Sequence, residues 1–148
     1  MNQARTTSDR LDTDWLLLLA AWLLVTASTL GSLFFSEVME LPPCSLCWYQ
    51  RVFMFPLVFV LFMGLFPFDT KVVRYALPLS AAGTLVALYH IMLQAGIIPK
   101  SAAPCSQGVS CSDVDLLVFG FASIPMLSLF AFGAVTALLI TILRSSSR

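Results

Sequence analysis

The sequence is poor in charged residues and carries no net charge. Asp, Glu, Lys and Arg make up 11% of its 148 residues, whereas 59% are hydrophobic and the mean hydropathy is +0.91. A soluble domain normally has about 25% charged residues, so this composition excludes a water-soluble globular domain and predicts an integral membrane protein. Because the formal net charge is zero, bulk charge gives no attraction to nucleic acid, and we expect no nucleic-acid partner.

Reactive side chains are also scarce: the chain has one histidine and four cysteines. One histidine cannot by itself build a haem or zinc site. The cysteines follow the pattern C-x2-C and C-x5-C, with residues 48–104 between the two halves. Zinc sites with four cysteines usually have shorter gaps and C-x2-C in both halves, so we expect no metal site. Four cysteines allow three pairings, of which proximity favours Cys44 with Cys47 and Cys105 with Cys111.

Four apolar segments are long enough to cross a bilayer, which takes about 20 residues at ~1.5 Å of rise each. They are residues 15–35, 48–66, 75–98 and 116–143. The glycines and prolines inside them are acceptable because membrane helices tolerate both. The sequence therefore predicts an all-α membrane protein, a four-transmembrane-helix bundle in which residues 1–148 form one membrane domain.

The basic residues predict the orientation of this bundle. Its two termini and middle loop share one side, which carries six of them: Arg5, Arg10, Lys71, Arg74, Arg144 and Arg148. The other side has Lys100 in a loop and Arg51 just inside a helix. Both termini are therefore expected in the cytoplasm, and loops 36–47 and 99–115, with both cysteine pairs, on the outer face. That side is oxidising, and paired cysteines persist there as disulfides.

Cys44 and Cys47 stand at the entrance to the second predicted helix, after Pro42-Pro43. The partial positive charge of a helix N-terminus stabilises a thiolate. This placement favours a pair that exchanges electrons over the alternatives, a plain cross-link or a metal-binding pair.

Arg51 lies four residues after Cys47, on the same face of the helix. It is either a snorkelling arginine at the interface or a fixed cation that stabilises negative charge on a thiolate or a reducible carbonyl. His90 and Gln94 form an i, i+4 pair in the third span. A polar pair there contacts either a ligand or another helix through a hydrogen bond.

Cys105 and Cys111 lie in a loop rich in Ser, Pro and Gly. Thiol–disulfide exchange requires a thiolate to attack a disulfide sulfur, and a pair in such a loop suits a shuttle. The alternative is a disulfide that only closes a small loop.

With these residues assembled, the sequence resembles the DsbB family of membrane thiol:quinone oxidoreductases, in its short BdbC-like branch. The resemblance covers nearly the whole chain and rests on three stretches besides the four spans and the second cysteine pair. They are "PCSLCWYQR" at 43–51, "YHIMLQ" at 89–94 and "FGFASIPMLSLFAF" at 119–132.

The resemblance implies a membrane thiol oxidase of the bacterial cytoplasmic (inner) membrane. A reduced thioredoxin-fold dithiol oxidase (DsbA-like) outside the cytoplasm attacks the Cys105–Cys111 disulfide, and Cys111 passes the electrons to Cys44. Cys47, as thiolate, contacts a quinone of the membrane pool (ubiquinone or menaquinone), with Arg51 stabilising that state and His90 near the same quinone. Disulfide bond formation in exported proteins is thereby sustained.

Two other functions are compatible with parts of the pattern. The first is a membrane protein that reduces outer-face disulfides with cytoplasmic electrons, which would need cysteines reachable from the inner side. The second is a non-enzymatic four-helix scaffold with two structural disulfides. Disulfides that resist reduction would identify the scaffold.

Overall fold

Four long helices account for most of the chain in the computed structural model, which describes residues 2–40, 43–99, 117–118 and 122–146. They are α1 (Asn2–Leu33), α2 (Ser45–Leu65), α3 (Val73–Gln94) and α4 (Ile124–Ser146). The shorter elements are a π-helical turn η1 (Phe34–Val38), a 3₁₀ turn η2 (Thr70–Val72) and the paired strands β1 (Leu117–Val118) and β2 (Ala122–Ser123). All four helices are long and apolar enough to cross a membrane, which confirms the predicted four-helix membrane fold.

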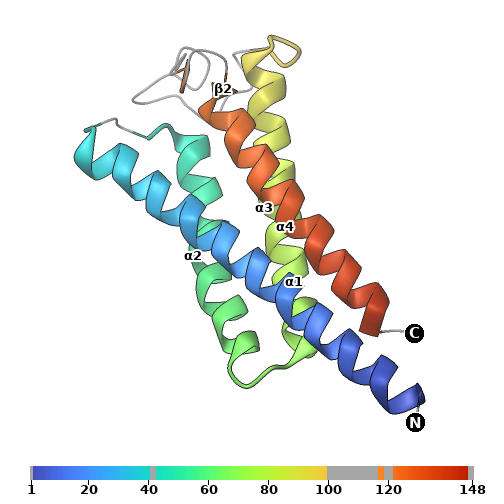
Figure 1. The fold of residues 1–148 in the computed structure, drawn as a ribbon. Helices are drawn as coiled ribbons and strands as arrows, with labels where there is room; N and C mark the ends of the chain where they lie inside the picture. The colour runs from blue at the N-terminus through green and yellow to red at the C-terminus, as the bar shows by residue number, and fades with distance from the viewer. Residues whose placement is uncertain (1, 41–42, 100–116, 119–121, 147–148) are drawn as a thin grey trace.

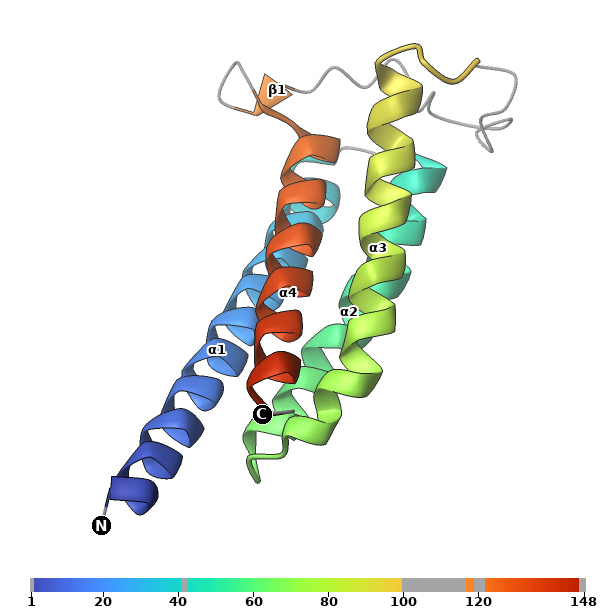
Figure 2. The same cartoon turned by 90° about the vertical axis from the view of Figure 1, so that its right-hand side faces the viewer.

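The helices form a ring in which neighbours in sequence are neighbours in space. α1 packs against α2 and α4, and α3 packs against the same two helices. Both chain termini lie at one end of the bundle (Figures 1 and 2), and α2 begins at the opposite end, where α3 stops. This topology brings the start of α2 beside the last turns of α3.

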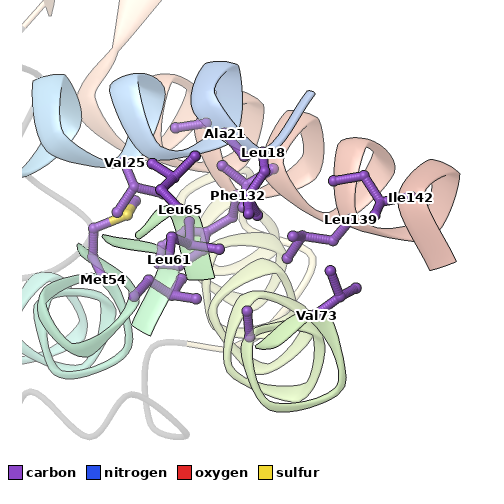
Figure 3. Packing of buried hydrophobic residues seen from close by; sticks show 14 residues of the cluster. Leu18, Ala21, Val25, Met54, Leu61, Leu65, Val73, Phe132, Leu139 and Ile142 are labelled. Atoms are coloured by element: carbon purple, nitrogen blue, oxygen red, sulfur yellow. The ribbon is translucent and has the colours of Figure 1, made fainter. Parts of the chain in front are cut away.

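The bundle interior is apolar and tightly packed (Figure 3). Leu18 and Val25 of α1, Leu61 of α2, and Phe132 and Leu139 of α4 are all fully buried there. Membrane helices associate through such van der Waals contacts and through small residues that allow close approach. The other face of the helices is also apolar, and its exposed side chains are suited to lipid.

The start of α2 is close to its predicted place. The helix begins at Ser45, three residues before the predicted start at 48. Cys44 occupies the N-cap position with an extended backbone (φ −68°, ψ 166°), and its carbonyl accepts a hydrogen bond from the N–H of Trp48 at 3.1 Å. Cys44 and Cys47 therefore flank the first turn of the helix, as the sequence predicted.

The end of α3 comes earlier than the predicted limit of the 75–98 span. The helix stops at Gln94, and Gly96 adopts a positive φ of 73° that a side chain would disfavour. The N–H of Ile97 bonds back to the carbonyl of Met92 at 3.0 Å, which closes the helix in a Schellman motif. Gly96 was the signal in the sequence for this end.

The predicted start of the fourth span, at residue 116, is too early. Residues 117–118 and 122–123 pair as antiparallel strands, and α4 begins only at Ile124. Pro125 lies in the first turn of α4, where its missing N–H is not needed. The sequence analysis placed Pro125 inside the fourth span, whereas it stands at the start of the helix.

Candidate functional site

Two thiols face each other at the N-terminus of α2. The Sγ atoms of Cys44 and Cys47 lie 3.0 Å apart in a hydrogen bond, and both cysteines are free. A disulfide would place the sulfurs about 2.05 Å apart, so the structure holds the reduced form of this pair. Cys44 is buried and Cys47 half-buried. The pair is thus placed to lose two electrons and close a disulfide across one helical turn.

His90 of α3 approaches this pair from the interior of the bundle. Its Nε2 lies 3.9 Å from the Sγ of Cys44, and its Nδ1 lies 3.5 Å from the side-chain amide of Gln50. Both polar side chains are more than nine-tenths buried. The Gln50 atom nearest to Nδ1 is the amide nitrogen, which can only donate, so Nδ1 accepts and the Nε2–H faces the Cys44 sulfur.

The contacts of Cys44 favour its charged form. The hydrogen bond between the two sulfurs lowers the pKa of Cys44 to about 4, although burial acts in the opposite direction. Hydrogen bonding with His90 and with the backbone N–H of Cys47 lowers the pKa of Cys44 further. These contacts favour the charged form of Cys44, and the thiolate role that the family resemblance implies for Cys47 stays a prediction.

Arg51 is held between two helices. Its Nε donates to the Ser32 hydroxyl at 2.7 Å and one terminal nitrogen donates to the Ser32 carbonyl, also at 2.7 Å. The guanidinium carbon lies 5.6 Å from the centre of the Trp48 ring, within cation–π range. These bonds tie the charge to α1 beside the dithiol, and they argue against the snorkelling interpretation.

A cavity of about 400 Å³ opens between α1, α2 and α4, directly against the dithiol. Its polar wall comes from Cys44, Cys47, Gln50 and Arg51, and most of the remaining wall is apolar. The apolar part includes Leu24, Phe35, Met54, Phe55, Leu127 and Phe130. The volume lies within the range of small-molecule sites in proteins, about 300–1,000 Å³.

The predicted site residues are thus only partly brought together. Cys44, Cys47 and Arg51 share the cavity wall, whereas His90 reaches the site through Cys44 and Gln50 and does not line the cavity. Cys105 and Cys111 lie outside the described residues.

Sequence analysis missed two residues of the site, Gln50 and Ser32. Gln50 had a usable signal, because an amide inside a membrane span usually faces a site or the bundle interior. Ser32 had none, since serines recur along the first span at positions 28, 32 and 36. Its contact with Arg51 depends on how α1 and α2 are rotated against each other.

Comparisons with known proteins agree with this geometry. A family model described as "Disulfide bond formation protein DsbB" matches residues 13–142. A "Probable disulfide formation protein" of Metapseudomonas resinovorans is 46% identical over 134 residues, covering 90% of this chain and 93% of the relative. "Probable disulfide formation protein C 2" of Bacillus cereus is 47% identical over 119 residues, covering 80% and 85%. "Disulfide bond formation protein C" of Bacillus subtilis is 42% identical over 115 residues, covering 78% and 83%. No solved structure matches the chain.

Proposed function

Because the chain belongs to the DsbB family of disulfide bond formation proteins, we propose that it is a thiol:quinone oxidoreductase that re-oxidises a thioredoxin-fold dithiol oxidase outside the cytoplasm. Its membership makes it a multi-pass bacterial membrane protein with an oxidoreductase role in disulfide bond formation. The quinone, the partner and the assignment of roles to the cysteines are the parts that we propose.

The observation that carries the proposal is the position of the reduced dithiol on the wall of the cavity, beside a fixed cation. Both sulfurs and Arg51 reach the same space, which is otherwise bounded mainly by apolar side chains. A dithiol that served only to brace a loop would need neither a cavity nor a charge tied down at its side.

The residues of the cavity fit a quinone headgroup, whether ubiquinone or menaquinone. The ring is apolar and suits the aliphatic and aromatic wall, while its carbonyl oxygens require hydrogen-bond donors. The guanidinium of Arg51 has five N–H donors, of which two bond to Ser32. When bound, a quinone supplies a two-electron acceptor that takes up the two electrons and two protons released as the dithiol closes to a disulfide.

The residues of this chain have separate tasks in that reaction. Arg51 stabilises negative charge at the polar end of the cavity, where the low dielectric strengthens its effect. The hydrogen bond between the two sulfurs favours the charged form of Cys44 in the reduced pair. His90, whose Nδ1 accepts from the Gln50 amide, directs its Nε2–H toward the Cys44 sulfur and stabilises negative charge there, and the apolar wall excludes water from the sulfurs.

The second cysteine pair supplies these electrons in our proposal. A reduced partner attacks the Cys105–Cys111 disulfide and leaves with its own disulfide formed. The Cys111 thiolate then attacks Cys44 of the Cys44–Cys47 disulfide, which frees Cys47. Closure of Cys105 onto Cys111 leaves Cys44 and Cys47 reduced. Each exchange conserves one disulfide and moves one electron pair. In the mixed-disulfide state the free thiol is Cys47, and in the dithiol state the thiolate is Cys44. Each sulfur therefore faces the acceptor at a different stage of the cycle.

The test is donor-dependent quinone reduction by the purified protein, followed by quinone absorbance. A reduced thioredoxin-fold dithiol is the donor, and Cys47→Ala, Cys111→Ala and Arg51→Ala are compared with Leu88→Ala on the exposed face of α3. We expect both cysteine variants to lose the activity. Arg51→Ala should lose about tenfold in kcat/KM for quinone, which corresponds to about 1.4 kcal/mol, and Leu88→Ala should retain the activity. Absence of quinone reduction with several donors and quinones, with both disulfides left intact, would instead support a structural scaffold.

A further inference from the structure

We propose that the reduced site is also a binding site for a zinc-class divalent cation, with Cys44, Cys47 and His90 as its ligands. These three residues each offer one ligand atom, and the three atoms all lie within 4.8 Å of one another. Thiolate and imidazole are the ligands that zinc prefers in proteins. The cysteine spacing that argued against a four-cysteine site does not apply here, because the third ligand comes from α3.

The distances between the donor atoms are close to those of a tetrahedral site. Zinc–sulfur bonds of about 2.3 Å and zinc–nitrogen bonds of about 2.0 Å place two sulfurs roughly 3.8 Å apart and sulfur and nitrogen roughly 3.6 Å apart. The sulfurs are 3.0 Å apart, and the Cys44 sulfur is 3.9 Å from the His90 nitrogen. The Cys47 sulfur and the His90 nitrogen lie within 4.8 Å. Cys47 is half-buried and lies in the first turn of α2, so a rotamer change can move its sulfur away from Cys44 and into the tetrahedral arrangement.

Gln50 contacts the histidine ligand at its other ring nitrogen. A histidine that binds a metal through one ring nitrogen usually donates its other N–H to an oxygen, which fixes the tautomer. The amide nitrogen of Gln50 stands 3.5 Å from Nδ1 of His90. A half-turn of the terminal amide exchanges this nitrogen for the amide oxygen, which accepts from Nδ1–H. Nε2, which faces the Cys44 sulfur at 3.9 Å, then binds the cation.

The cavity gives the cation both a path and a fourth ligand position. Cys44 and Cys47 line it, so an ion can reach the sulfurs without unfolding of the bundle. Three protein ligands with an open fourth position are typical of zinc sites that exchange water or small molecules. Water from the cavity would occupy that position.

Binding of the cation releases protons without a change of oxidation state, and it prevents disulfide formation. The cation takes two thiolates and one neutral imidazole, any thiol proton still present is released, and no electron moves. Sulfurs held by the metal cannot close a disulfide, and the oxidised pair has no thiolate to offer. The ion therefore binds the reduced state alone and arrests it. This arrest rests on the proposed function, whereas the binding does not.

The experiment measures binding by the spectrum of cobalt, which substitutes for zinc and shows thiolate-to-cobalt charge-transfer bands. The full-length protein carries Cys105→Ser and Cys111→Ser, so that only the pair at α2 contributes. It is reduced, freed of reductant under anaerobic conditions and titrated with Co²⁺. The same chain with Cys44–Cys47 oxidised is the matched control, and Leu88→Ala is the control variant.

We expect one Co²⁺ per reduced chain, displacement of cobalt by Zn²⁺, and no bands in the oxidised chain. His90→Asn should weaken binding by more than about 100-fold, and Gln50→Leu by about tenfold, as is usual for partners of metal-bound histidines. X-ray absorption of the zinc-bound chain, with His90 intact, should show two sulfurs and at least one imidazole. Two sulfurs without imidazole, or no stoichiometric binding by the reduced chain, would overturn the site.

A separate measurement tests the arrest. The unsubstituted protein is fully reduced, and a single turnover of quinone reduction is followed without donor, with and without one equivalent of Zn²⁺. We expect zinc to slow this turnover by more than tenfold and a chelator to restore it. Turnover that proceeds unchanged with zinc bound would overturn the arrest. If no turnover occurs even without zinc, the proposed function fails, while the cobalt titration still decides whether the site exists.

Discussion

At the residue scale, the position of Arg51 depends on a single serine of another helix. The guanidinium donates two hydrogen bonds to Ser32, one to its hydroxyl and one to its carbonyl, at 2.7 Å each. The hydroxyl can be removed without touching the charge. Ser32 is thus a positioning residue. Its substitution changes how the guanidinium of Arg51 is held and leaves the positive charge in the chain.

We predict that Ser32→Ala raises the KM for quinone by less than the roughly tenfold loss expected for Arg51→Ala and leaves kcat little changed. A lost hydrogen bond to a charged group costs about 1.5–3 kcal/mol, part of which the remaining carbonyl bond offsets. Steady-state quinone reduction measures both constants. Thr141→Ala, which removes an exposed hydroxyl bonded only within α4, is the control. An unchanged KM in Ser32→Ala would show that the carbonyl alone positions Arg51.

Cys44 is the second feature at this scale, since its neighbours lower its pKa to about 4 and thereby favour its charged form. The Cys44 thiolate should persist from neutral pH down to about pH 4 and be protonated below it. Between that value and the ordinary thiol pKa, the folded protein binds fewer protons than the unfolded chain, so rising pH favours folding in this window.

The thiolate absorbance near 240 nm of the reduced protein, with Cys105→Ser and Cys111→Ser, measures this titration. We expect a midpoint near pH 4, which moves toward the ordinary thiol value in Cys47→Ala because the main hydrogen bond is lost. His90→Asn should move it in the same direction by a smaller amount. The signal should vanish in Cys44→Ser. A midpoint near pH 8–9 in the unsubstituted pair would contradict the assignment of charge to Cys44.

At the element scale, one glycine allows α3 and α4 to pack closely. A Cβ on Gly83 would overlap the ring of Phe132, which is fully buried in the core. Small residues at such contacts let membrane helices approach, and no other residue type fits here without displacement of the ring. Gly133, one residue along α4, has no atom within 4 Å of an added Cβ.

These two glycines form a matched pair for a stability measurement. We predict that Gly83→Ala destabilises the bundle by about 1–3 kcal/mol, the usual cost of overpacking a core, whereas Gly133→Ala is neutral or slightly stabilising because alanine favours the helix. Thermal unfolding in detergent, followed by the helical circular dichroism signal, compares the two. Equal midpoint temperatures would show that the α3–α4 contact accommodates the added methyl group without loss of stability.

At the scale of the whole molecule, the site and the chain termini lie at opposite ends of the bundle (Figures 1 and 2). The distribution of Lys and Arg predicts that the termini face the cytoplasm. If so, the dithiol is near the outer face, where a partner outside the cytoplasm can supply electrons. The orientation is thus a requirement of the proposed function and can be measured by itself.

We predict opposite labelling of two exposed positions at the two ends. In a chain whose four cysteines are replaced by serine, Ile97→Cys should react with a membrane-impermeant maleimide in intact cells. Asp69→Cys should react only after permeabilisation. Ile97 follows α3 and Asp69 precedes it, both side chains are exposed, and acidic residues contribute little to orientation. The reverse pattern would place the dithiol on the cytoplasmic side and exclude the proposed partner.

The sequence by itself determined the class of the protein, its four helices, the cysteine pair at the start of α2 and the family resemblance. The hydropathy of the chain and the spacing of Cys44, Cys47 and Arg51 are enough to predict these features. The predicted helix boundaries were less accurate where one residue decides them, as Gly96 and Pro125 do.

Only the tertiary structure decided that His90 meets Cys44, that Ser32 holds Arg51 and that three helices enclose a cavity. Those contacts join residues 19 to 46 positions apart, and they depend on the rotation of each helix. Close packing such as that of Gly83 against Phe132 sets this rotation, and the hydropathy of the sequence does not predict the rotation.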